Sequence, residues 1–94
     1  MKNKLKLGKL VMTRGINDEI AINEEFSKEI LRSLARYKSM DWGELCEEDK
    51  QMNDRAIDMG DDRIFARYDT SKGIVYIITE WDRSVTTILF SSEY

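Results

Sequence analysis

The spacing of apolar residues changes once along this chain, and this change constrains the fold more than any other feature. Between Glu24 and Lys38 the apolar residues recur at helical spacing, at Phe26, Ile30, Leu34 and Tyr37. After Gly60 they follow a period of two in three segments, Arg63 to Asp69, Gly73 to Glu80 and Ser84 to Phe90. Short turns separate these segments, so the sequence predicts an antiparallel meander of three strands.

Two further elements are expected before the meander. Leucines and lysines interleave between Leu5 and Met12, which predicts a first strand with a slip in register at Gly8. Asn17 and Asn23 can each cap a helix. A second long helix is expected to begin at Asp41, because Asp41 and Glu44 have the spacing of a capping box, and to end at Gly60.

The whole chain is expected to form one domain over residues 1–94. Its 94 residues suffice for a single core, and no linker or repeat divides them. The predicted class is α+β: one N-terminal strand, two to three helices, then the meander that completes a four-stranded sheet. Monomer and homodimer both remain open.

Composition excludes several kinds of chemistry. The chain has one cysteine and no histidine, which excludes an internal disulfide and the usual zinc sites. No catalytic motif, cofactor or metal is expected. The N-terminus lacks the apolar run of a signal peptide, and no stretch has the roughly 20 apolar residues of a membrane helix, so we expect a cytoplasmic protein.

Acidic side chains gather on the helix that follows Asp41. Residues 41–62 hold nine acids against two bases, whereas residues 1–14 hold five bases and no acid. This distribution indicates an acidic face for a protein partner and argues against general nucleic-acid binding. A solvated helix face explains the same pattern, and the spacing is not that of a calcium loop. The candidate partner-binding residues are Glu44, Glu47, Glu48, Asp49, Asp54 and Asp58.

Two smaller groups are further candidates. Arg63, Arg67 and Arg83, with Tyr68, could contact an anion or RNA, and cross-strand ion pairs on an outer sheet face explain the same arginines. Trp42 and Trp81 lie at element ends, where a tryptophan is either an interface anchor or a closure of the core. Cys46 lies among carboxylates, which disfavour a reactive thiolate.

The predicted order of elements resembles that of the RelE/ParE toxins. The segment from Asp62 to Tyr68, followed by a hairpin, is similar to the second strand of that family. The resemblance implies an RNA-directed activity that would use the arginines and Tyr68. The net charge of −3 and the absence of histidine depart from the basic ribonuclease members of the family.

Three segments also resemble a small family of bacterial proteins encoded on plasmids and other mobile elements, often labelled as type I restriction subunit M. They are Val11 to Asn17, Asp41 to Lys50 and Ile78 to Thr87. The resemblance implies a protein of a mobile element, and no function of that family carries over to this chain. It does not imply methyl transfer, because the chain has no glycine-rich cofactor loop and is too short for a methyltransferase domain.

These observations favour a non-enzymatic protein-interaction module, an accessory or anti-defence protein that acts through the acidic helix face. Two alternatives remain open. One is a toxin-like protein acting on RNA through the arginines, and the other is a binder of a small anionic ligand.

Overall fold

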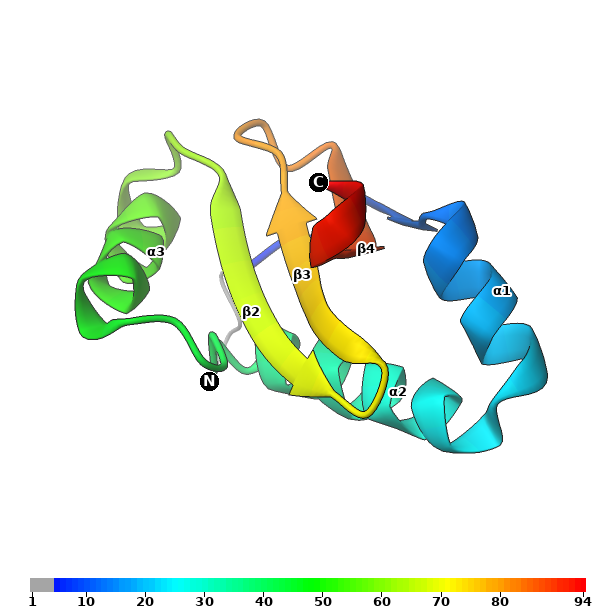
Figure 1. The fold of residues 1–94 in the computed structure, drawn as a ribbon. Coiled ribbons are helices and arrows are strands. Elements are labelled where there is room, and N and C mark those ends of the chain that lie inside the picture. The colour runs from blue at the N-terminus through cyan, green and yellow to red at the C-terminus, as the bar shows by residue number, and fades with distance from the viewer. Residues whose placement is uncertain (1–4) are drawn as a thin grey trace.

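The structure is a computed structural model that describes residues 5–94. In chain order its elements are β1 (Lys9–Met12), α1 (Arg14–Ile22), α2 (Glu24–Lys38), α3 (Glu47–Met59), β2 (Ile64–Thr70), β3 (Gly73–Thr79), β4 (Val85–Phe90) and a 3₁₀ turn, η1 (Ser91–Glu93) (Figure 1). The predicted α+β class is confirmed, with one strand, three helices and then three strands.

The four strands form one mixed sheet in the order β1-β4-β3-β2. The last three strands pair antiparallel, whereas β1 pairs in parallel with β4, with Lys9 opposite Val85. The three helices between β1 and β2 carry the chain from one edge of the sheet to the other. The edge strand β2 therefore lies beside α3, the last of these helices (Figure 1).

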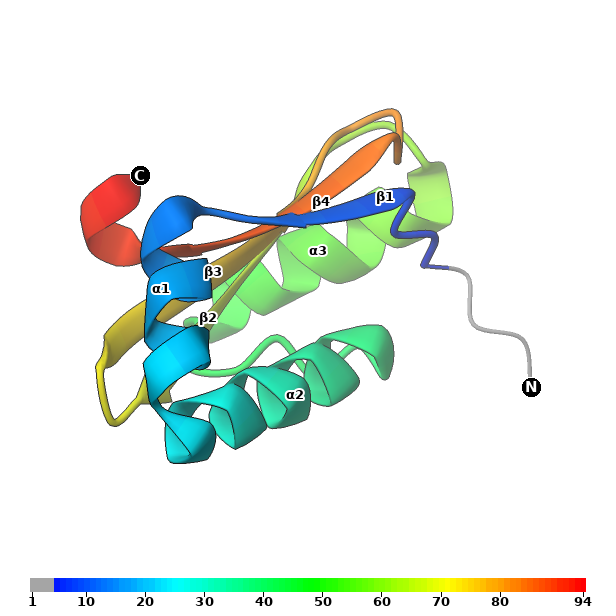
Figure 2. The same ribbon diagram turned by 90° about the vertical axis from the view of Figure 1, so that its right-hand side faces the viewer.

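One face of the sheet carries the main core. Ile64, Val75, Ile77 and Ile88 are at most 1% exposed and belong to one apolar cluster with residues of α1 and α2, including Phe26, Ile30 and Ile16. Figure 2 shows α2 running along this face and α1 standing next to it. The amphipathic pattern predicted for residues 24–38 is realised as α2, whose N-cap Asn23 accepts a hydrogen bond from the backbone N of Phe26.

A chain of hydroxyl groups crosses this core. The Tyr37 hydroxyl lies 2.6 Å from Thr79 Oγ1, which lies 2.7 Å from Thr86 Oγ1. Thr86 donates its proton to the backbone oxygen of Leu7, so Thr79 donates to Thr86 and Tyr37 donates to Thr79. Burial raises the pKa of Tyr37 above its ordinary range, which keeps the first donor protonated.

The opposite face of the sheet is apolar as well. The rings of Phe65, Tyr76 and Tyr94 contact one another there, with centroids 4.6 to 6.0 Å apart. Ile78 and Leu89, which point to the same side by the two-residue period, are 6% and 7% exposed. Among residues 5–94, the C-terminal turn η1 and Tyr94 are what lies over this face (Figure 1).

Two predicted boundaries are wrong. The segment from Asp41 to Glu44 is not helical, because Gly43 has φ of +77° and forms a bridge to Arg67, and α3 begins only at Glu47. The first strand begins at Lys9 rather than Leu5, because Gly8 has φ of +64° and interrupts it. Thr13, predicted to end that strand, is the N-cap of α1.

Within residues 5–94, no helix is long and apolar enough to span a lipid bilayer.

Candidate protein-binding surface beside helix α3

Helix α3 is attached to the edge of the sheet along one side only. The Asn53 side chain donates to the backbone oxygen of Phe65 at 2.7 Å and accepts from its nitrogen at 3.2 Å. Trp42 Nε1 donates to Asp54 at 2.9 Å, and Arg83 donates to the backbone oxygen of Ala56 at 3.0 Å. These bonds fix the helix firmly, and they leave its remaining sides in contact with solvent.

The structure places the six predicted acidic residues in three different settings. Glu44 precedes α3, and its carboxylate lies 3.7 Å from Arg36 and accepts a hydrogen bond from the backbone of Asp69. Asp54 is engaged by Trp42. Glu47, Glu48, Asp49 and Asp58 are exposed on α3.

The first turn of α3 concentrates negative charge. Glu47, Glu48 and Asp49 all lie there, where the positive end of the helix dipole stabilises carboxylates. None of the ion pairs within residues 5–94 involves these three side chains. Their charges are therefore available to a partner.

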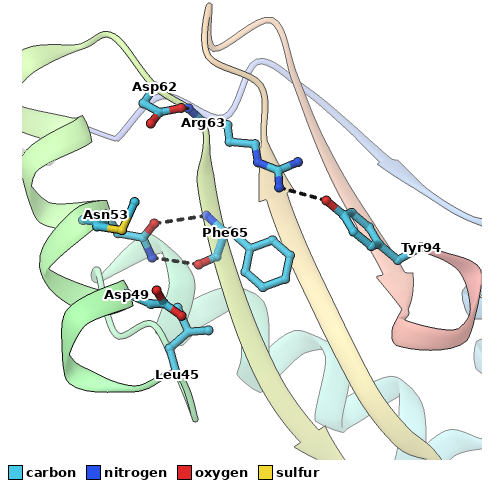
Figure 3. A pocket seen from close by; sticks show the side chains of 8 residues that line it. Leu45, Asp49, Asn53, Asp62, Arg63, Phe65 and Tyr94 are labelled. Atoms are coloured by element: carbon cyan, nitrogen blue, oxygen red, sulfur yellow. Dashed lines mark hydrogen bonds between the residues drawn. The ribbon is translucent and has the colours of Figure 1, made fainter.

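A groove runs between α3 and the outer face of β2 (Figure 3). A cavity of about 340 Å³ is lined by Leu45, Asp49, Met52, Arg63, Phe65 and Tyr94, among others. A second cavity, of about 230 Å³, shares Met52 and Asp62 with the first and extends to Met59. Because the two cavities share lining residues, they adjoin each other beside the helix, and together we call them the α3 groove.

The apolar residues of α3 are more exposed than their spacing predicts. Leu45, Met52 and Met59 follow one another at intervals of seven residues, the pattern of a helix stripe that packs against a partner. Met52 is 55% exposed and Met59 is 67% exposed. Leu45, which lies two residues before α3, packs against the core, whereas the domain leaves Met52 and Met59 largely uncovered.

The predicted arginine cluster does not form a single site. Arg63 lies in the groove, with its guanidinium over the rings of Phe65 and Tyr94 and a 2.8 Å hydrogen bond to the Tyr94 hydroxyl (Figure 3). Arg67 lies on the outer sheet face, 3.4 Å from Asp69. Arg83 is committed to backbone oxygens, those of Asp62, Glu80, Trp81 and Ala56.

Tyr68 is buried on the other face of the sheet from Arg67. It is 1% exposed, and its hydroxyl donates to the backbone oxygen of Asp41 at 2.7 Å. Burial raises the pKa of Tyr68 above its ordinary range. The side chain is therefore fixed inside the domain, out of reach of an anion on the surface.

The two tryptophans differ in setting. Trp42 is 3% exposed and packs edge-on against Tyr37, with ring centroids 5.4 Å apart, so it closes the core. Trp81 is 64% exposed in the turn between β3 and β4. Of the pair, Trp81 is the one that a partner can reach.

The sequence contains signals for the groove that periodicity alone did not reveal. Asn53 is buried on the same side of α3 as Ala56, and a polar side chain in such a position must find a hydrogen-bond partner. Phe65 and Tyr94 gave no such signal in the sequence, because their rings come into contact only when the C-terminal segment folds back onto the sheet.

The groove brings together several kinds of side chain. In the part of the chain that the structure describes, no group of three or more Asp, Glu or Cys side chains could hold a metal ion. The groove offers carboxylates, thioethers, two aromatic rings and two guanidinium groups, which suit association with a polypeptide. No protein-family model, no curated protein and no solved structure matches this chain.

Proposed function

We propose that this chain is a protein-interaction module without enzymatic activity, and that it binds its partner through the exposed side of α3. The observation that supports this most directly is the first turn of that helix. Glu47, Glu48 and Asp49 project into solvent there without an ion-pair partner among residues 5–94. A rigid helix with clustered charge favours rapid association with a positively charged protein surface.

The resemblance of three segments to plasmid-encoded proteins fits an accessory or anti-defence role in a bacterial mobile element. The partner would then be a cytoplasmic protein of the element or of its host. The arginine-based alternatives have less support, because Arg83 and Tyr68 are both engaged by backbone oxygens. A toxin-like protein would instead arrest growth when its expression is induced.

Charge reversal in two matched positions tests the proposal. Glu47→Lys with Glu48→Lys reverses the first two residues of α3, and Glu24→Lys with Glu25→Lys reverses the first two residues of α2. Both double variants place positive charges at the positive end of a helix dipole, so both are expected to lose small amounts of stability. The α2 variant also loses the exposed ion pairs of Glu24 with Lys28 and of Glu25 with Arg32, so its loss of stability should be at least as large as that of the α3 variant. Affinity capture from nuclease-treated native lysate then compares their partners with those of the wild type.

We expect the wild type and the α2 variant to retain the same protein, and the α3 variant to lose it. Retention of that protein by the α3 variant would contradict the proposed surface. Recovery of nucleic acid in place of a protein, in the absence of nuclease, would contradict the function itself. Displacement of the partner by competing DNA, with a steep dependence on salt, would identify a surface that imitates DNA.

A further inference from the structure

The α3 groove lies against the outer face of the sheet, as a trough between two walls. Helix α3 forms one wall, and η1 with Tyr94 forms the other, with β2 and β3 between them (Figures 1 and 3). The other face of the sheet is covered by α1 and α2, as is usual for a sheet with an apolar face. A helix placed over the outer face would complete a third layer.

The floor and the inner wall of this trough are apolar. Phe65 and Tyr94 lie in it, and Leu45 reaches it from the segment before α3 (Figure 3). Met52 lines it from the helix. Met52 and Met59 remain more than half exposed, although each could bury its thioether against an apolar partner. Methionine adapts its shape to different partners, and exposed methionines are common at surfaces that bind amphipathic helices.

The rim of the trough is acidic. Between Glu47 and Asp62 the chain has seven acidic against two basic residues, a net charge of −5. Of the charged residues that line the two cavities, three are acidic (Asp49, Asp61 and Asp62) and two are basic (Arg63 in the larger cavity and Arg55 in the smaller one). Arg63, the one base that lines the larger cavity, already has its guanidinium against Tyr94 and Phe65.

We propose that the trough binds an amphipathic helix of the partner protein. Its apolar stripe would lie on Met52, Met59 and Phe65, and lysine or arginine side chains on its flanks would face the carboxylates of α3. Because α3 has 13 residues and spans about 20 Å, a partner helix of about 14 residues matches its length. This inference rests on the proposed function and specifies the kind of partner.

A synthetic peptide of about 14 residues, with leucines at helical spacing and lysines elsewhere, is the probe. A scrambled peptide of the same composition controls for charge, and a version with glutamate in place of lysine controls for shape. The readout is the NMR signal of ¹³C-labelled methionine methyl groups in the full chain. Met12, which is 37% exposed on β1 at the opposite edge of the sheet, is the internal reference.

We expect the amphipathic lysine peptide to shift the methyl signals of Met52 and Met59 and to leave that of Met12 unchanged. The scrambled peptide should bind at least about tenfold more weakly, because it cannot bury a continuous apolar stripe. Equal binding of the scrambled peptide, equal binding of the glutamate peptide, or unshifted Met52 and Met59 signals would each overturn the inference.

Met52→Gln with Met59→Gln separates this inference from the proposed function. Both side chains are exposed, so the substitutions should leave the fold intact, and the affinity for the lysine peptide should fall by about tenfold or more. If this variant still captured the natural partner while the Glu47 and Glu48 variant lost it, the protein-binding function would stand and the helix-in-trough mode would be wrong.

Discussion

The side-chain amide of Asn53 pairs with both backbone polar groups of Phe65, as donor at 2.7 Å and acceptor at 3.2 Å. Phe65 belongs to the edge strand β2, whose outward backbone groups would otherwise be free to pair with another chain. Two residues further along β2, the backbone nitrogen of Arg67 donates to the backbone oxygen of Trp42. The backbone oxygen of Arg67 accepts from the backbone nitrogen of Glu44. The edge beside α3 is therefore blocked, and a partner on this side meets side chains rather than a strand.

Replacing Asn53 tests how much this block stabilises the fold. Asn53→Leu keeps the side-chain volume but leaves the nitrogen and oxygen of Phe65 without partners in a partly buried setting. We expect a loss of about 2 to 3 kcal/mol in the free energy of unfolding, measured with urea. Gln51→Leu, at an exposed position of the same helix, should change it by less than about 0.5 kcal/mol. Equal effects of the two substitutions would show that the amide pair contributes nothing.

Gly43 is the position where the connection between α2 and α3 meets β2. A Cβ there would collide with the backbone oxygen of Arg67 and the ring of Tyr68, and φ is +77°. We expect Gly43→Ala to cost about 3 kcal/mol or more in unfolding free energy. Gly60→Ala has a similar φ of +68° and open space, so it should cost about 1 kcal/mol. Thermal unfolding of both variants measures the difference, and equal losses would assign the whole effect to φ.

The same connection explains why the predicted capping box was wrong. Asp41 is not at a helix start, because Arg36 binds its carboxylate at 2.8 and 3.2 Å. The backbone of Glu44 bonds instead to Arg67, which lies 23 residues later in the chain. Local spacing favours a helix, and tertiary pairing with the strand edge overrides it. Gly43 was the available warning, since glycine is unfavourable inside a helix.

The helices, the meander and the acidic segment could be predicted because they depend on local periodicity, as at Phe26 and Ile30. The α3 groove could not be predicted from local periodicity. Met52 and Met59 lie at helical spacing in the sequence, and only the position of α3 beside β2 determines that both are exposed. Arg63 and Tyr94 are 31 positions apart in the sequence, and no local pattern predicts the hydrogen bond between them.

The buried hydroxyl chain makes a third prediction about stability. Thr79→Val preserves shape but removes the acceptor of Tyr37 and the donor to Thr86. We expect a loss of about 2 kcal/mol in unfolding free energy, because a buried hydroxyl without a partner is costly. Thr87→Val, half-buried on the outer face of β4, is the matched control and should change stability by less than about 0.5 kcal/mol. Similar values for both would mean that the chain of hydroxyls is energetically neutral.

Glu93 should make stability depend on pH. The Thr13 hydroxyl, followed by the backbone nitrogens of Phe90 and Gly15, holds the pKa of Glu93 below its ordinary value. The unfolded chain then takes up a proton at a higher pH than the folded one. The stabilisation is present above the ordinary value of about 4.3 and is lost as the pH falls through the lower pKa of the folded state.

Urea midpoints measured between about pH 3 and pH 7 should show this loss in the wild type. In Glu93→Gln the corresponding part of the pH dependence should be absent. Thr13→Ser keeps the hydroxyl and should keep the dependence, whereas Thr13→Val should reduce it. A wild type and a Glu93→Gln variant whose midpoints differ equally at every pH would contradict the assignment.

Arg83 and Arg63 offer a direct contrast between a guanidinium that bonds to the backbone and an exposed one that contacts aromatic side chains. Arg83 donates to four backbone oxygens and joins the end of α3 to the turn between β3 and β4. A lysine cannot reproduce that fork, so Arg83→Lys should lower the free energy of unfolding by about 2 kcal/mol. Arg63→Lys should lower it by less than about 1 kcal/mol, since the group is exposed. If Arg83→Lys instead left stability unchanged and weakened the binding of inorganic phosphate, Arg83 would be an anion ligand and its bonds to the backbone would be dispensable.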